Sequence, residues 1–201
     1  MPAKNIVKIY VKDGFYHVYN RGVEKRDVFL DKQDYRVFLR FLKEALLSPS
    51  ELIRMKKEVS FKGATFKGLM KPPKNFYGKI EMHVYSFMPN HFHFLLKQLE
   101  ERSMHQFLHS ITTRYVIYFN KKYKRVGALF QSAYKASFIS EESYLLHLSR
   151  YIHRNNLQYT DDLKTAYSSY GEYLGIRKTA WIKPELILSF FQPGKLPYLK
   201  H

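Results

Sequence analysis

Two histidines flank a phenylalanine in the run His91, Phe92, His93, within residues typical of a β-strand. Successive side chains of a strand point to opposite faces, so both imidazoles should lie on one face and Phe92 on the other. Neutral imidazole is the commonest metal ligand among side chains, and two imidazoles one pleat apart can share a divalent ion. The same spacing also suits two histidines that face solvent, so it indicates a metal site only in combination with other residues.

A second group of polar side chains falls on a helix expected to run from Ser140 to about Asn156. At helical spacing, one stripe of this helix is polar and another is apolar. The polar stripe holds His147, Tyr151 and Asn155, and the apolar stripe holds Leu145, Leu148 and Ile152. A phenol can attack phosphorus as a covalent nucleophile, and an amide oxygen four residues later can complete a metal site. Because the chain has 17 tyrosines, spacing alone does not separate a nucleophile from a packing residue.

Four segments, taken together, resemble the successive signatures of insertion-sequence HUH transposases, with the REP-associated tyrosine transposases as the closest branch. The segments are residues 16–22 (YHVYNRG), 88–96 (MPNHFHFLL), 127–131 (GALFQ) and 150–155 (RYIHRN). Residues 167–175 (YSSYGEYLG) resemble a C-terminal motif of that branch, so the likeness covers nearly the whole chain. The order and spacing of the segments make the resemblance specific.

The resemblance implies that His91 and His93 bind a catalytic metal, that Tyr151 is the single nucleophilic tyrosine and that Asn155 is the third ligand. It implies Mg²⁺ or Mn²⁺ as the cofactor, single-stranded or hairpin DNA as the partner, and a 5′-phosphotyrosine intermediate. The branch commonly has proline after this asparagine, whereas this chain has Asn156. That departure weakens the comparison at the end of the helix but leaves the ligand type intact.

Three other residues of the same predicted helix are candidates for a role in the site. Tyr144 is the reserve nucleophile, but the residue four positions later is Leu148 and not an amide. His153 lies about 200° around the helix from Tyr151, which predicts a bystander. Arg154 lies nearer the polar stripe, where it either steadies a phosphate or faces solvent.

The charge balance of the chain indicates a polyanionic partner. The chain has 34 Lys and Arg against 17 Asp and Glu, a formal net charge of +17. Such a field attracts nucleic acid, although a basic enzyme of another kind or a membrane-surface binder has the same balance. The absence of cysteine excludes disulfides and thiol nucleophiles. No segment has the apolar length of a membrane span, so we expect a cytoplasmic protein with no membrane partner.

The elements that must position these residues alternate between strand and helix periodicity. The pattern predicts strands at residues 15–20, 79–88, 91–98 and 129–139, and helices from Asp31 to Pro49, from Ser103 to about residue 120, and from Ser140 to about Asn156. This order predicts an α+β protein with a ferredoxin-like, split βαβ antiparallel sheet and helices packed on it. We expect residues 1–156 to form the catalytic domain and residues 157–201 a small helical appendage.

Two basic stretches are candidates for contact with phosphates. Residues 51–78 carry seven Lys or Arg against two Glu, with glycines and prolines that favour an inserted loop or arm. The stretch 121–125 predicts a basic turn after the helix that starts at Ser103. Exposed Tyr and Phe side chains near such stretches would stack on bases.

Two other functions remain open from the sequence. One is a catalytically inactive nucleic-acid-binding domain of the same fold, which the intact set of His91, His93, Tyr151 and Asn155 argues against. The other is a metal phosphoesterase that uses water, with Tyr151 as a structural residue. The pattern is equally compatible with a monomer and a homodimer, and it does not identify the DNA sequence that is cut.

Overall fold

A four-stranded antiparallel sheet forms the centre of the protein. The computed structural model describes residues 10–54, 58–61, 64–67 and 73–191. The strand order is β4-β5-β1-β6, with β1 at Gly14–Arg21, β4 at Ile80–Met88, β5 at His91–Gln98 and β6 at Lys135–Ile139. All three neighbouring pairs are antiparallel. This is the order of a split βαβ sheet, so the predicted α+β, ferredoxin-like fold is confirmed. A separate two-stranded sheet joins β2 (Glu58–Phe61) to β3 (Ala64–Lys67).

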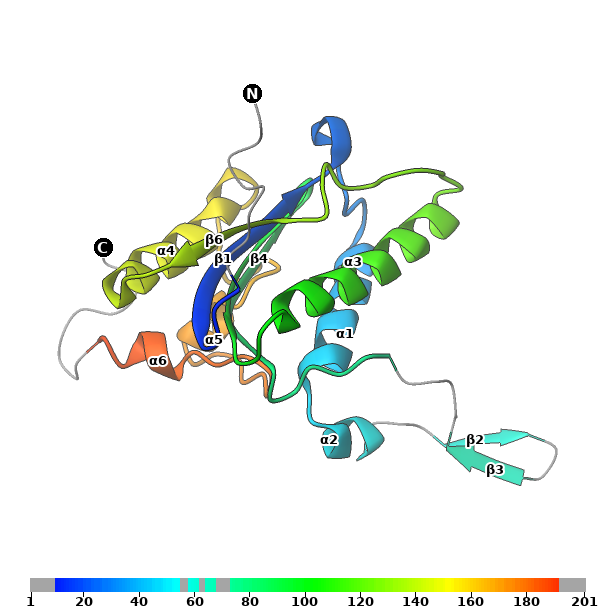
Figure 1. Cartoon of the computed structure of the whole chain (residues 1–201). Helices are drawn as coiled ribbons and strands as arrows, with labels where there is room; N and C mark the ends of the chain where they lie inside the picture. The colour runs from blue at the N-terminus through cyan, green and yellow to red at the C-terminus, as the bar shows by residue number, and fades with distance from the viewer. Residues whose placement is uncertain (1–9, 55–57, 62–63, 68–72, 192–201) are drawn as a thin grey trace.

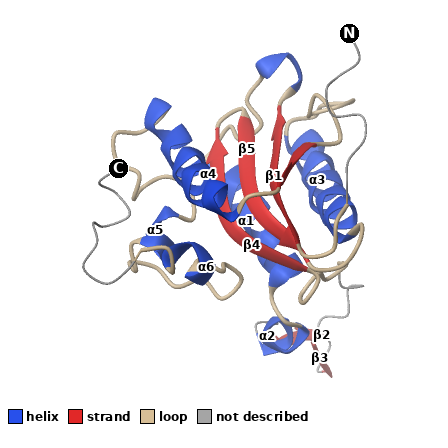
Figure 2. Ribbon diagram, turned by 60° about the vertical axis from the view of Figure 1, so that its left-hand side comes forward, coloured by secondary structure: helices blue, strands red, loops and turns tan. Residues whose placement is uncertain are grey.

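Helices cover both faces of the central sheet. Figure 1 shows α1 and α3 on one side of the sheet and α4 on the other, and Figure 2 shows α4 lying across the strands. The α-helices are α1 (Lys32–Leu46), α2 (Pro49–Arg54), α3 (Ser103–Lys122), α4 (Glu142–Arg154), α5 (Tyr170–Tyr173) and α6 (Glu185–Leu188). Two 3-10 turns, η1 (Val23–Lys25) and η2 (Asn155–Gln158), follow β1 and α4. Among the described residues, no helix is long and apolar enough to cross a membrane.

The start of α1 follows the sequence prediction, and its end differs slightly. The Asp31 side chain accepts hydrogen bonds from the backbone N–H groups of Gln33 and Asp34 and forms a capping box with Asp34. The helix ends at Leu46, and Pro49 is the first residue of α2. Proline is favoured at the first position of a helix because the N–H it lacks would have no partner there. Pro49 therefore separates two helices and does not lead into a loop.

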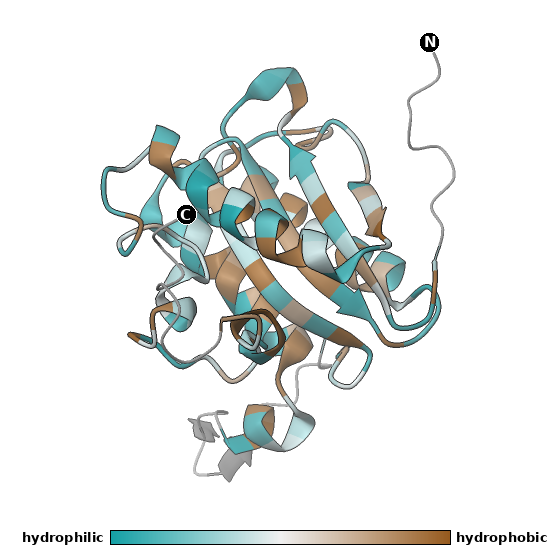
Figure 3. Cartoon of the chain, turned by 90° about the vertical axis from the view of Figure 1, so that its left-hand side faces the viewer, coloured by the Kyte–Doolittle hydropathy of each residue, from teal (hydrophilic) through white to brown (hydrophobic). Residues whose placement is uncertain are grey.

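Apolar side chains pack on both faces of the sheet, which explains why β4 and β5 are buried almost throughout. One cluster, under α1 and α3, contains Phe38, Phe92 and Phe107. The other, under α4, contains Leu95 and Ile152. Figure 3, which views the α4 side, shows apolar and polar residues alternating along the strands. The polar side chains of β1 and β5 on this face lie outside the two apolar clusters and can form a site.

Residues after 157 pack into both clusters. Trp181 joins the cluster under α1 and α3, where it stacks on Tyr85 with ring centroids 5.6 Å apart, and Tyr173 joins the cluster under α4. The backbone N–H of Ser169 donates to the Tyr85 carbonyl at 3.0 Å, which ties the segment to β4. The division into a catalytic domain at residues 1–156 and an appendage at residues 157–201 stays a prediction. The packing makes residues 157–191 part of the same core.

The predicted basic arm at 51–78 contains regular structure where it is described. It holds most of α2 and the small sheet of β2 and β3. Its last part belongs to the core, because Phe76 is buried and its ring stands edge-on to Phe107 with centroids 5.6 Å apart. The backbone N–H of Phe76 also donates to the Ala45 carbonyl at 2.7 Å. The expectation of a loop over the whole arm is therefore wrong for the residues around Phe76. Lys56, Lys57, Lys62 and Lys71 lie outside the described residues.

The predicted basic turn at 121–125 and the strand after it also differ from the structure. Lys121 and Lys122 belong to the last turn of α3, and the ammonium of Lys122 binds the carboxylates of Asp31 and Asp34 at 2.7 and 2.8 Å. The strand begins at Lys135 and not at residue 129. The Asn20 side chain bonds the carbonyls of residues 132 and 133, so a side chain takes the place of strand pairing there.

Candidate active site

The pairing of β1 with β5 places the two candidate metal ligands beside β1. His93 lies opposite Tyr19, and His91 lies opposite Arg21. Both histidines lie on the face covered by α4, whereas Phe92 is fully buried in the cluster under α1 and α3. The alternation predicted from the sequence therefore separates the imidazoles from the phenylalanine between them.

Helix α4 brings Tyr151 next to His93 within a single chain. Leu148 and Ile152 are buried against the sheet, and Tyr151 is 52% exposed at the edge of the helix. The rings of Tyr151 and His93 stand edge-on, with centroids 5.9 Å apart and an angle of 86° between planes. Among the described residues, the Tyr151 hydroxyl makes no hydrogen bond, so it is available to a substrate.

A third histidine, His17 of β1, completes the group, and sequence reasoning gave it no role. Its Nε2 lies 2.7 Å from Nδ1 of His93, and the two rings are nearly parallel with centroids 5.0 Å apart. Its ring also stands edge-on to Tyr151 at 6.1 Å. Alternation within residues 15–20 places His17 and Tyr19 on one face. Only the register with β5 shows that this face is the one that carries His93.

His91 is held by its neighbour Asn90. The Nδ1 of His91 lies 2.5 Å from Oδ1 of Asn90, and the Asn90 amide nitrogen donates to the Lys25 carbonyl at 3.2 Å. Lys25 and the preceding Glu24 have positive φ angles of 62° and 56°, in the sharp turn η1 that follows β1. This turn presents the carbonyl that orients Asn90.

Burial keeps the three imidazoles neutral at pH 7. It lowers the pKa of His17 to about 4. Burial and the positive charge of Arg21 lower the pKa of His91 to about 4. Burial, with the neighbouring His17 and His91, lowers the pKa of His93 to about 2. A neutral imidazole has the lone pair that a metal ligand needs, so this environment suits metal binding.

The donor set fits a divalent ion only in part. In the described ranges, no cluster of three or more His, Cys, Asp or Glu is placed to hold a metal. His91 and His93 would supply two imidazole nitrogens, with ring centroids 5.2 Å apart. Any further ligands must then be oxygens from an amide, water or a substrate phosphate, which Mg²⁺ and Mn²⁺ accept.

Asn155 lies next to Tyr151 at the end of α4, where η2 begins. Its amide nitrogen donates to the backbone carbonyl of Tyr151 at 2.9 Å, and its amide oxygen makes no hydrogen bond within the described chain. No hydrogen bond between described residues joins it to His91 or His93. The structure therefore places Asn155 beside the tyrosine with a free amide oxygen, and its role as third ligand stays a proposal.

The other polar residues considered on α4 and η2 have structural roles or face solvent. His153 is buried, with Nε2 2.8 Å from the Ser169 hydroxyl and its ring edge-on to Tyr173, so it points into the core and away from the site. The amide of Asn156, which replaces the proline of the resembled branch, donates to the buried Ser86 hydroxyl. Arg154 and Tyr144 are exposed.

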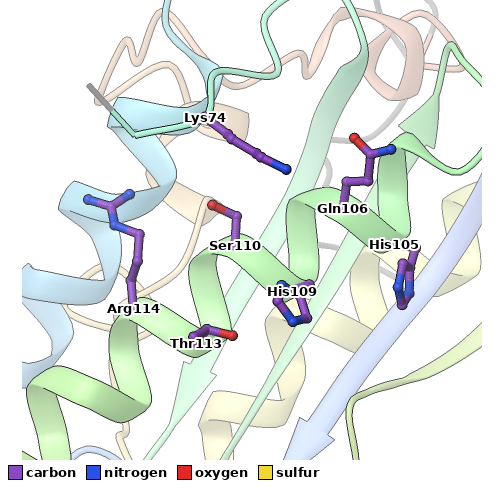
Figure 4. Close-up of a pocket in the computed structure, with 7 residues that line it drawn as sticks. All are labelled: Lys74, His105, Gln106, His109, Ser110, Thr113 and Arg114. Carbon is purple, nitrogen blue, oxygen red and sulfur yellow. The ribbon is translucent and has the colours of Figure 1, made fainter. Parts of the chain in front are cut away.

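A separate hollow lies on α3, on the other side of the sheet from the candidate active site (Figure 4). Seven residues line it: Lys74, His105, Gln106, His109, Ser110, Thr113 and Arg114. None of the seven is acidic and each can donate a hydrogen bond. The Arg114 guanidinium is already paired with the Glu44 carboxylate, and the hollow contains none of the residues that the sequence predicted for chemistry.

The fold and the site together define a class: an antiparallel split βαβ domain with two strand histidines and a helix tyrosine meeting on one face. Residues 72–155 match the model of the family described as IS200-like transposases. This match confirms the resemblance inferred from the sequence. No curated protein matches the chain.

The fold is also that of a solved protein described as a REP-associated tyrosine transposase bound to a REP hairpin. The match has a TM-score of 0.56 and 10% sequence identity, and it covers 90% of this chain and 97% of that one. At this identity the match confirms the fold and not the details of the site.

Proposed function

We propose that this chain is a metal-dependent, single-tyrosine transposase that cleaves and rejoins single-stranded DNA at hairpin-associated sites. The observation that supports this most directly is the position of Tyr151 beside His93 within one chain. Of the tyrosines on α4, only Tyr151 has a ring contact with the histidines in the described structure. A relationship to the IS200-like transposases agrees with DNA cleavage and transfer as the activity.

In the proposed reaction, the Tyr151 oxygen attacks the scissile phosphorus, and the bond from phosphorus to the 3′-oxygen breaks. The phenol loses its proton, and the departing 3′-oxygen takes up a proton to become a free hydroxyl. The product is a 5′-phosphotyrosine link, which keeps the free energy of the cleaved phosphodiester bond. A second 3′-hydroxyl can therefore attack this link, reverse the step and join strands. Tyr151 suits this role because it is exposed at the helix edge and its hydroxyl has no partner among the described residues.

We propose that His91 and His93 hold Mg²⁺ or Mn²⁺, with Asn155 as a further ligand. The ion, when bound, would supply Lewis-acid stabilisation of charge on the phosphate. The histidines support this role because both are neutral and lie beside the candidate nucleophile. Asn155 supports it by its free amide oxygen one turn from Tyr151.

DNA as the partner is supported by the +17 charge and by the solved relative, which is described as bound to a REP hairpin. Basic side chains would neutralise phosphates, and exposed aromatic rings would stack on unpaired bases.

The test is covalent trapping. The protein is incubated with a labelled hairpin oligonucleotide and Mn²⁺, denatured, and digested for peptide mapping. A denaturation-resistant adduct on Tyr151 supports the proposal. Cleavage without an adduct would favour the water-using phosphoesterase, and binding with neither cleavage nor adduct would favour an inactive nucleic-acid-binding domain.

A further inference from the structure

We propose that His17 and Asn90 are positioning residues that hold His93 and His91 through their Nδ1 atoms and so present both Nε2 atoms to one divalent ion. This inference rests on the proposed function. It concerns two residues outside the proposed ligand set, His17 on β1 and Asn90 in the turn between β4 and β5.

The hydrogen bonds around His91 define which of its ring nitrogens carries the proton. The Asn90 amide nitrogen donates to the Lys25 carbonyl, so the other amide atom, Oδ1, faces His91. An amide oxygen only accepts, and therefore Nδ1 of His91 must be the donor. A neutral imidazole carries one proton, so Nε2 of His91 has a free lone pair.

His93 is also held through its Nδ1 atom, but here the proton of the hydrogen bond can belong to either histidine. The bond between its Nδ1 and His17 Nε2 needs one donor and one acceptor, and either nitrogen can be the donor. If His17 donates, the proton of His93 sits on Nε2, and this nitrogen cannot bind a metal. If His93 donates, its Nε2 is free. A metal ion would therefore select the arrangement in which His93 Nδ1–H donates to His17.

Asn90 and His17 therefore orient the two candidate ligands in the same way. Both histidines use Nδ1 for a bond of 2.5 to 2.7 Å, and no hydrogen bond of the described residues uses either Nε2. The rings of His17 and Tyr19 also lie next to the His93 ring and nearly parallel to it, with centroids at 5.0 and 5.4 Å, and their own centroids are 5.1 Å apart. Partners of this kind orient metal-bound histidines and raise their basicity, and losing one costs roughly 10- to 100-fold in metal affinity.

The test measures Mn²⁺ affinity by calorimetry, without DNA. His17→Phe keeps an aromatic ring at this position but removes the acceptor, and should weaken Mn²⁺ binding by roughly 10- to 100-fold. His17→Gln restores an acceptor and should recover most of the affinity. The control is Tyr144→Phe, an exposed residue of α4 with no ring contact to His93 in the described structure, which should bind Mn²⁺ within about twofold of the wild type. Unchanged affinity in His17→Phe would overturn the proposal.

A second readout uses the unmodified protein, so it does not depend on how a variant folds. Nitrogen-15 NMR of the Zn²⁺-loaded protein, Zn²⁺ serving as a diamagnetic probe, should show the ring proton of both His91 and His93 on Nδ1. A proton on Nε2 of His93 in the loaded protein contradicts the proposal.

His91→Ala separates this inference from the proposed function. If His91→Ala and the wild type bind Mn²⁺ equally, the metal site itself is wrong. If His91→Ala loses binding while His17→Phe retains it, the metal site stands and only the positioning role fails.

Discussion

The ring of Tyr151 stands edge-on to the ring of His93, with centroids 5.9 Å apart, although one belongs to a helix and the other to a strand far away in the sequence. Tyr144 of the same helix is equally exposed, at 53% against 52%. It has no ring contact with His93 in the described structure. The position over the histidines, and not exposure, distinguishes Tyr151 from the other tyrosine of α4.

This relationship predicts the effect of removing one oxygen atom. Tyr151→Phe should abolish DNA cleavage and the covalent adduct while DNA binding persists. The free energy of unfolding should change by less than about 1 kcal/mol, because the hydroxyl makes no hydrogen bond within the described residues. Gel analysis of the denatured adduct and thermal melting measure the two effects.

Tyr144→Phe is the matched control, since it removes the same atom from a side chain of equal exposure on the same helix. It should cleave DNA at the wild-type rate. An adduct that survives Tyr151→Phe and disappears in Tyr144→Phe would reverse the assignment.

Removal of either imidazole should remove metal dependence. We expect His91→Ala and His93→Ala to lose Mn²⁺ binding in calorimetry and cleavage in the oligonucleotide assay. Asn155→Ala should have a milder effect, because water can replace an amide oxygen on Mg²⁺. Equal Mn²⁺ affinity in the wild type and in the double histidine variant would refute the assignment.

Two neighbouring lysines at the end of α3 should behave differently. Lys121 is exposed, whereas Lys122 binds Asp31 and the buried Asp34. Burial alone would raise the pKa of Asp34, but the hydrogen bond from Lys122 and its other donors hold this pKa below its usual value. Lys122→Ala should therefore lower the free energy of unfolding by roughly 1–3 kcal/mol, the cost of losing hydrogen bonds to charged groups.

Lys121→Ala should instead leave stability unchanged and weaken DNA binding. If Lys121 contacts one phosphate of single-stranded DNA, the slope of log affinity against log salt should become shallower by about 0.7. Fluorescence anisotropy at several salt concentrations measures this slope. An unchanged slope would show that Lys121 lies outside the DNA path.

The stability of the protein should fall in mild acid because of buried histidines. Burial lowers the pKa of His153 to about 3, below the usual value of 6.5. Between pH 6.5 and about 3 the unfolded chain binds a proton here and the folded chain does not, so stability rises with pH through this window. Each such group contributes a slope of up to about 1.4 kcal/mol per pH unit.

His153→Gln should therefore lose less stability than the wild type between pH 7 and pH 5, measured by urea unfolding at both values. His147→Gln, at an exposed position of the same helix, serves as the control and should follow the wild-type pH dependence. If His153→Gln also follows it, His153 does not contribute to acid sensitivity.

The segment after residue 157 should be needed for stability. Trp181 is buried in the cluster under α1 and α3, so Trp181→Ala should lower the free energy of unfolding by roughly 3–5 kcal/mol. Ile176 is 64% exposed, and Ile176→Ala should change stability by less than about 0.5 kcal/mol. Chemical denaturation measures both. A fragment of residues 1–156 that unfolds as cooperatively as the full chain would show that the segment is a dispensable appendage.

The sequence by itself determined the local geometry of the site. The two-residue period of a strand puts His91 and His93 on one face, and the 3.6-residue period of a helix separates Tyr151 from the apolar stripe. The alternation of these periods was also enough to predict the split βαβ order. Each of these inferences uses residues within a few positions of one another, where periodicity carries the information.

Only the tertiary structure decided which distant residues meet. The register of β1 against β5 brings His17 to His93, and the crossing of α3 over α1 pairs Lys122 with Asp34. The packing of Trp181 on Tyr85 likewise joins the end of the chain to β4. Local periodicity cannot reveal these pairs, because strand register and helix packing depend on side chains from segments far apart in the chain. A shift of one residue in the register would turn every side chain of the strand to the other face.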